Sequence, residues 1–161
     1  MEHVAALCEN DQQVAVSVAF LETSTQMVGS LGREGLRVGT INGTQSAAEN
    51  ERQRVAFQTG QLDVIVFTVT ESISLHQGEL PGGDRPRSLV IHDVRHSAIQ
   101  MKQIEGRCHR DGQRALIYYA YAEDTVDERL ATRAMARMAS MDSMAGDDVD
   151  DLDALIAEIA A

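Results

Sequence analysis

Five short apolar runs recur along the chain, and longer segments with helical patterning separate them. Each run has the length of a strand, and they occupy residues 14–20, 37–42, 62–67, 88–93 and 115–121. The first run, VAVSVAF, is apolar nearly throughout rather than alternating, which is typical of a strand buried on both faces.

The segments between the runs favour helices. We predict these helices at residues 3–9, 22–34 and 46–58, from Ser97 onward, and at 125–141. Capping-box spacing supports two of the starts, in Ser46 with Glu49 and in Thr125 with Glu128. The inner face of the second helix is expected to comprise Leu21, Met27, Val28 and Leu31.

Strand and helix therefore alternate with short links, and Gly35 and Gly60 follow two of the helices. One longer link, residues 78–87, holds three glycines and both prolines and is predicted to be a surface loop. The alternation predicts an α/β fold, a parallel sheet with helices on both faces.

From Asp142 the composition changes, so we divide the chain into residues 1–141, the α/β domain, and 142–161, an acidic tail. The tail has an acidic run at 147–153 and an apolar stripe at helical spacing, formed by Leu152, Leu155, Ile156 and Ile159. Two interpretations stay open. The tail solubilises or docks on its own domain, or its short amphipathic helix binds a groove of a protein partner.

Charge and composition narrow the range of functions. The 161 residues leave room for one domain, and the net charge of −11 argues against a generally basic, nucleic-acid-coating surface. Cys8 and Cys108 lack metal-ligand or disulfide spacing, and so do the five histidines, so no metal site and a reducing, cytoplasmic or otherwise intracellular setting are expected. No apolar run is long enough to span a membrane.

The candidate chemistry lies in residues 103–113, QIEGRCHRDGQ. Interpreted as a helix, this segment has an apolar side formed by Met101, Ile104 and Cys108. Its other side is a stripe at i, i+3, i+4 and i+7, formed by Gln103, Gly106, Arg107 and Arg110. Arginine is permanently charged and has forked donors, so two arginines at this spacing indicate a clamp on a phosphoryl group. A solvated arginine pair is the alternative.

The order Q-x-x-G-R-x-H-R-x-G-Q resembles motif VI of superfamily 2 helicases and translocases, in the form typical of Swi/Snf-type ATPases and their bacterial and phage relatives. Other segments resemble the second RecA-like domain of that superfamily, in the right order. The first comprises residues 41–44, Arg52 and residues 57–60. The second, residues 67–76, is at the motif V position, and its Ile-Ser-Leu-His is similar to Strawberry notch-like proteins. The third is residues 124–130. The resemblance covers residues 14–138.

The resemblance implies roles for individual residues. Arg110 is the expected arginine finger, Arg107 is its partner at the phosphates, and Gln103 and Gly106 shape the ATP interface. The expected nucleic-acid contacts are Gly43, Thr44, Thr68, Thr70, Ser72 and Ser74. Motif V usually has glycines near Ser72, and the alternative is that the hydroxyls of Thr68, Thr70, Ser72 and Ser74 cap a strand-to-loop turn.

No segment has the form G-x-x-x-x-G-K-[ST], and Lys102 is the single lysine. The resemblance therefore implies that ATP and Mg²⁺ are held mainly by a missing first RecA-like domain, in cis or as a separate subunit. We expect a second motor domain of a DNA helicase or translocase, inactive as an ATPase alone. The alternatives are a non-enzymatic RecA-like adaptor that binds a protein through its acidic tail, and an unrelated nucleotide-binding domain, which the lack of a glycine-rich loop disfavours.

Overall fold

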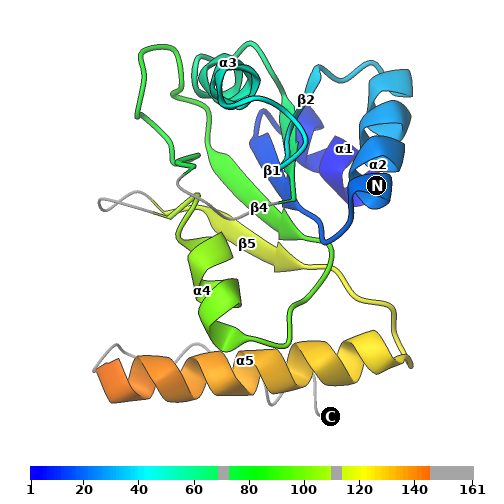
Figure 1. The fold of residues 1–161 in the computed structure, drawn as a ribbon, viewed down its shortest axis with the longest axis vertical. Coiled ribbons are helices and arrows are strands. Elements are labelled where there is room, and N and C mark those ends of the chain that lie inside the picture. The colour runs from blue at the N-terminus through cyan, green and yellow to red at the C-terminus, as the bar shows by residue number, and fades with distance from the viewer. Residues whose placement is uncertain (69–72, 110–113, 146–161) are drawn as a thin grey trace.

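A parallel sheet forms the centre of the molecule. The computed structural model of the chain describes residues 1–68, 73–109 and 114–145. Within them, five strands form one sheet in the order β2-β3-β1-β4-β5 (Figure 1). The strands are β1 (Gln13–Ser17), β2 (Val38–Ile41), β3 (Val64–Phe67), β4 (Arg87–Ile91) and β5 (Leu116–Tyr119). Every pairing is parallel, so the predicted α/β class is confirmed.

Helices cover both faces of this sheet, because successive side chains of each strand point to opposite sides. The helices are α1 (Glu2–Glu9), α2 (Leu21–Arg33), α3 (Ala47–Gln58), α4 (Ala98–Glu105) and α5 (Val126–Ala145). Val16 and Val66 belong to the core under α1 and α2. Ile65 and Leu89 belong to the core under α3 and α4. The long α5 packs on α4 and crosses its end (Figure 1).

Several helix ends follow the local sequence signals. The Ser46 hydroxyl accepts a hydrogen bond from the Glu49 amide at 3.2 Å, which caps α3 as predicted. The Glu49 carboxylate bonds Arg52 and Gln53, so the capping box is one-sided. Gly60 follows α3 with φ of 74°, a left-handed conformation that glycine adopts without strain.

The structure corrects the predicted edges of several elements. The strands are shorter than the apolar runs, and β1 ends at Ser17. Leu21 was predicted on the inner face of α2, but it begins the helix and is 44% exposed, whereas Met27 and Leu31 are buried. The last helix continues to Ala145 rather than ending at residue 141. The tail from residue 146 onward lies outside the described residues.

The main correction concerns the arginine stripe. The helix that was predicted to carry it ends at Glu105, and residues 106–108 form a turn. The Arg107 and Cys108 amides bond carbonyls three residues back, at 3.1 Å each, which is a tighter winding than an α-helix. Arg107 therefore follows α4 instead of lying on its face. The predicted apolar side is correct, since Met101, Ile104 and Cys108 are buried.

Candidate functional site

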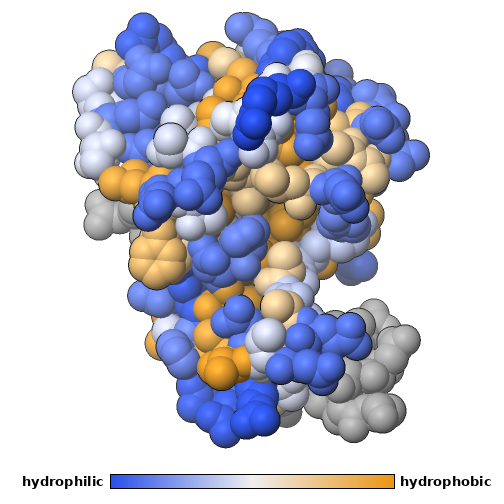
Figure 2. Space-filling model, turned by 90° about the vertical axis from the view of Figure 1, so that its right-hand side faces the viewer, coloured by the Kyte–Doolittle hydropathy of each residue, from blue (hydrophilic) through white to orange (hydrophobic). Residues whose placement is uncertain are grey.

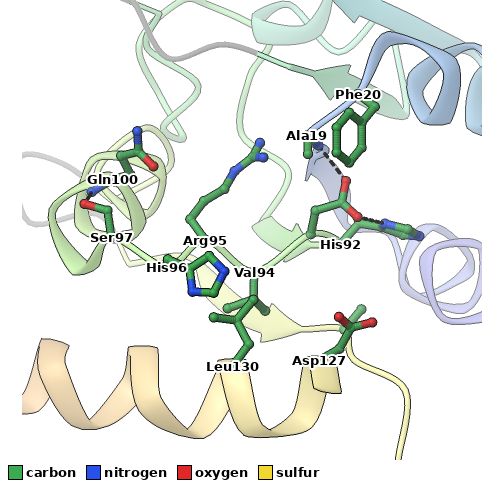
Figure 3. Close-up of a pocket in the computed structure, with 12 residues that line it drawn as sticks. Ala19, Phe20, His92, Val94, Arg95, His96, Ser97, Gln100, Asp127 and Leu130 are labelled. Carbon is green, nitrogen blue, oxygen red and sulfur yellow. Dashed lines mark hydrogen bonds and ion pairs between the residues drawn. The ribbon is translucent and has the colours of Figure 1, made fainter. Parts of the chain in front are cut away.

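The carboxyl ends of the strands form one edge of the sheet, and the connections to the helices pass along it. In open parallel sheets, ligands bind at this edge where the strand order reverses. Here the reversal falls between β1 and β4, because the chain runs to β2 and β3 on one side of β1 and then to β4 on the other. A cavity of about 410 Å³ opens there (Figure 3). Its lining includes Phe20 after β1, residues 92–97 after β4, and Asp127 and Leu130 of α5.

Two hydrogen bonds tie the ends of β1 and β4 together beside this cavity, and a third joins two neighbouring residues after β4. Asp93 accepts from the Ala19 amide at 2.5 Å through one carboxylate oxygen, and its other oxygen lies 2.9 Å from His92 Nδ1 (Figure 3). Arg95 reaches across to donate to the Val18 carbonyl at 2.8 Å. The Phe20 ring remains 67% exposed at the rim. Sequence reasoning missed these residues, although His92-Asp93 directly follows a buried strand, which was an available signal.

The predicted nucleic-acid contacts that the structure describes fall in two places. Gly43 and Thr44 follow β2, and Thr68 follows the neighbouring β3, where its amide donates to the Ile41 carbonyl at 3.1 Å. Gly43 has open space where a side chain would be. The Thr44 amide and hydroxyl both bond Asn42 Oδ1, at 3.0 and 2.7 Å, and so cap the turn that follows β2.

Ser74 lies in the second place, beside Arg107. The Ser74 hydroxyl oxygen is 2.6 Å from His76 Nδ1. Arg107 Nη1 donates to the Ile73 carbonyl at 3.3 Å, and the Leu75 amide donates to the Arg107 carbonyl at 2.7 Å. The structure thus brings the motif V-like segment against the motif VI-like segment, although 34 residues separate Ile73 from Arg107.

Of the other predicted site residues, some lie near the end of α4 and the rest lie outside the described residues. Gln103 and Gly106 are exposed near the end of α4, and Arg107 is half-buried. Arg110, Thr70 and Ser72 lie outside the described residues. The predicted stripe is therefore not a single helical face, and of its two arginines the structure places only Arg107.

The opposite edge, at the amino ends of the strands, also holds charged residues. Arg87, the first residue of β4, is 2% exposed. Its guanidinium donates to the side-chain oxygens of Gln13 and Gln58 and lies 4.6 Å from the centre of the Phe57 ring. Burial lowers the pKa of Arg87 to about 10 and raises the pKa of the nearby Cys108 thiol to about 12.

Asp63, just before β3, forms a second charged cluster at the same edge. Arg37 bonds both of its carboxylate oxygens, at 2.6 and 2.9 Å, and Arg85 bonds one at 3.0 Å. The Arg37 hydrogen bond is the main reason why the pKa of Asp63 falls to about 2. These contacts satisfy the charges of Asp63, Arg37 and Arg85 within the protein, so this cluster offers little to a ligand.

Comparison with known proteins places the fold. No protein-family model matches the chain. Over 99 residues, 60% of the chain, it is 29% identical to the ATP-dependent DNA helicase RecG of Acidithiobacillus ferridurans, and the match spans 14% of that relative.

Two solved structures show the same architecture at low sequence identity. The C-terminal part of the Fun30 ATPase domain matches with a TM-score of 0.66 and 14% identity, over 80% of this chain and 40% of that one. The C-terminal domain of S. cerevisiae Dbp5, bound to Gle1 and IP6, matches with a TM-score of 0.59 and 15% identity, over 98% and 89%. The chain therefore has the RecA-like α/β fold of helicase C-terminal domains.

None of the helices in the described ranges is long and apolar enough to cross a membrane. The same part of the chain brings together no group of three or more His, Cys, Asp or Glu side chains that could hold a metal ion.

Proposed function

We propose that this chain is the second motor domain of a superfamily 2 DNA helicase or translocase. A first RecA-like domain, in the same polypeptide or as a separate subunit, supplies the Walker motifs and holds ATP and Mg²⁺. The observation that carries the proposal is the pair of hydrogen bonds between Arg107 and residues 73–75. They join the two segments whose sequences resemble motifs V and VI into one surface, as a motor that couples ATP to nucleic acid requires.

The roles at the ATP interface follow from the order of residues in the motif VI-like segment. Arg110 is the arginine finger, and Arg107 is the second arginine, held by the Ile73 carbonyl. The exposed Gln103 and Gly106 border the same interface. Guanidinium groups that stabilise charge on a transferring phosphoryl group accelerate hydrolysis by about 10³-fold or more. The nucleotide itself and its metal ion belong to the partner domain.

The nucleic-acid face lies at the carboxyl ends of β2 and β3. Gly43 leaves room for a phosphate to approach the backbone, and Thr68 is adjacent to it across the strand pair. Thr70 and Ser72, which lie between Thr68 and Ser74 in the sequence, are further proposed contacts. Thr44 supports the turn through Asn42 as well as bordering the face. Closing and opening of the two domains would move the polymer along these residues.

The subtype within the superfamily is the Swi/Snf type or the related Strawberry notch-like type. The eleven-residue motif VI-like segment supports the first, and Ile-Ser-Leu-His at 73–76 supports the second. The segment 124–130 leads into α5, where the Asp124 amide donates to the Glu128 carboxylate at 2.8 Å. Such a motor works on intracellular DNA, so we place the protein inside the cell.

The test is reconstitution with a first RecA-like domain that carries the Walker motifs, from the same polypeptide or a neighbouring gene. DNA-stimulated ATP hydrolysis is measured for each part and for the mixture. We expect turnover only in the mixture, with Arg107→Ala reducing it strongly and the exposed Arg33→Ala leaving it unchanged. If no such domain restores hydrolysis, and Arg107→Ala changes nothing, the proposal fails and a non-enzymatic adaptor that acts through its acidic tail replaces it.

A further inference from the structure

One face of α5 carries a row of three arginines that the proposed motor function does not use. Arg129, Arg133 and Arg137, here called the α5 arginine row, are spaced at i, i+4 and i+8 and are all exposed. The opposite face of α5 is buried against α4 through Ala131, Met135 and Met138. The row therefore lies on the exposed side of α5, away from its buried face. The helix itself crosses one end of the molecule (Figure 1).

The row borders a groove. His96, Val126, Leu130 and Ala134 line this hollow of about 250 Å³ together with the three arginines. His96 and Leu130, both labelled in Figure 3, also line the cavity at the carboxyl ends of β1 and β4. Because the two hollows share these residues, they adjoin. Arg137 donates to the His96 carbonyl at 3.0 Å, which fixes one end of the row beside the loop that follows β4.

The charge of the row is uncompensated within the described part of the chain. Ion pairs there join carboxylates to Arg37, Arg52, Arg54 and Arg85, whereas none involves the α5 arginine row. This contrast is notable in a protein with 25 acidic and 14 basic residues. Like charges four residues apart destabilise a helix, so a polyanion bound along the row would relieve an unfavourable interaction.

The spacing between the arginines of the row indicates which kind of polyanion could bind there. Four residues of helix rise about 6 Å, so the three guanidinium groups can follow a line of regularly spaced negative charges. The phosphates of an extended single strand of nucleic acid form such a line, and grooves that bind single strands are positively charged along the backbone path. The carboxylates of Asp93 and Asp127 line the adjoining cavity and would repel phosphates. The phosphate backbone is therefore expected to follow the arginines rather than enter the cavity.

We infer that the α5 arginine row is an additional binding surface for the phosphate backbone of single-stranded DNA, next to the carboxyl ends of the strands. The inference deepens the proposed function by assigning a path for the polymer on this domain. It does not depend on ATP or on the partner domain, so its failure and that of the motor proposal can be told apart.

The test compares two double variants of the full chain that lose the same charge. Arg129→Gln/Arg133→Gln removes two members of the row and keeps Arg137 on His96. Arg33→Gln/Arg37→Gln, on exposed positions of α2 and just before β2, is the matched control. Binding of a fluorescein-labelled oligo-dT is measured by fluorescence anisotropy at several salt concentrations, after circular dichroism has shown that both variants are folded.

For a single strand, each lost phosphate contact reduces the slope of log K against log salt by about 0.7. The row variant should therefore lose about 1.4 from the slope and bind at least about 10-fold more weakly at low salt. The control should keep the wild-type slope. Equal losses in both variants, an unchanged row variant, or no measurable binding by the wild-type chain at low salt would overturn the inference.

The chain's own acidic tail is the competing occupant, and a third variant separates it from DNA. Replacing the five aspartates at 147–153 by asparagine removes five negative charges without truncating the chain. If the row binds DNA, the row substitutions reduce binding in this background as well. If they have no effect in this background, the row is not a DNA site.

Discussion

The two edges of the sheet use charged residues in opposite ways. At the amino ends of the strands, Arg87 and Asp63 are surrounded by partners, from Gln13 and Gln58 to Arg37 and Arg85. At the carboxyl ends, an open cavity lies above the bonds of Asp93 and Arg95, and Phe20 remains exposed at its rim. Saturated charges stabilise a fold, whereas accessible groups around a cavity can bind a ligand, so we assign stability to the Arg87 and Asp63 clusters and ligand binding to the carboxyl edge. The amino edge also carries part of the proposed site, because Gln58 bonds both Arg87 and the carbonyl of Ser74, which lies beside Arg107.

The amino edge is expected to show the largest stability effect, in Arg87→Ala. The change leaves a cavity beside Phe57 and removes the donor from two buried amide oxygens, a combined loss of about 3–5 kcal/mol. Urea denaturation measures it. Arg95→Ala, at the other edge, is the matched control, because it removes one bond from a half-buried side chain and should cost about 1 kcal/mol. If Arg87→Ala and Arg95→Ala lowered the free energy of unfolding equally, the proposed difference between the two edges would be wrong.

A smaller, pH-dependent effect is expected at Asp63. Its pKa is lowered to about 2 in the folded protein, so the carboxylate stabilises the fold above its ordinary pKa of 3.8. This contribution, about 1–2 kcal/mol after solvent screening, is lost as the pH falls through the folded value. Asp63→Asn should be less stable than wild type at pH 6, and the difference should shrink toward pH 2. Denaturation curves at the two pH values give the comparison, and a difference that is constant with pH would contradict it.

The smallest stability effect is expected at the carboxyl edge, in Phe20→Ser. Because the ring is mostly exposed, the free energy of unfolding should change by no more than about 0.5 kcal/mol. Phe57→Ser, at a fully buried ring, is the matched substitution and should cost about 3–5 kcal/mol. A large loss in Phe20→Ser, measured by urea denaturation, would show that this edge also serves the core.

The difference between the edges also explains what the sequence could predict. The buried strands and the cap of α3 depend on local pattern, so the apolar runs and Ser46 predicted them. Arg87 was placed in a surface loop, because its partners Gln13 and Gln58 are 74 and 29 residues away. The helix after Ser97 was extended too far because the spacing of Gln103, Gly106 and Arg107 suits a helix, whereas contacts with residues 73–75 accompany a turn there.

The sequence could predict which residues belong to the candidate site, but not how they lie relative to one another. Motif-like order in the sequence identified Arg107 and the segment around Ser74 separately, and the fold shows that they touch. The cavity between β1, β4 and α5 has no local signature, because its lining comes from loops that only the strand order brings together. Phe20 was accordingly predicted to be part of a buried strand.

The most direct test of the account is Arg110→Ala in the reconstituted two-domain motor, with kcat for ATP hydrolysis measured at saturating DNA. Arg33→Ala, on the exposed side of α2, is the control for charge. We expect Arg110→Ala to lower kcat by about 10³-fold or more, with nucleotide binding and domain association little changed. A kcat within a factor of about two of wild type, in a mixture that still hydrolyses ATP, would show that this chain supplies no arginine finger.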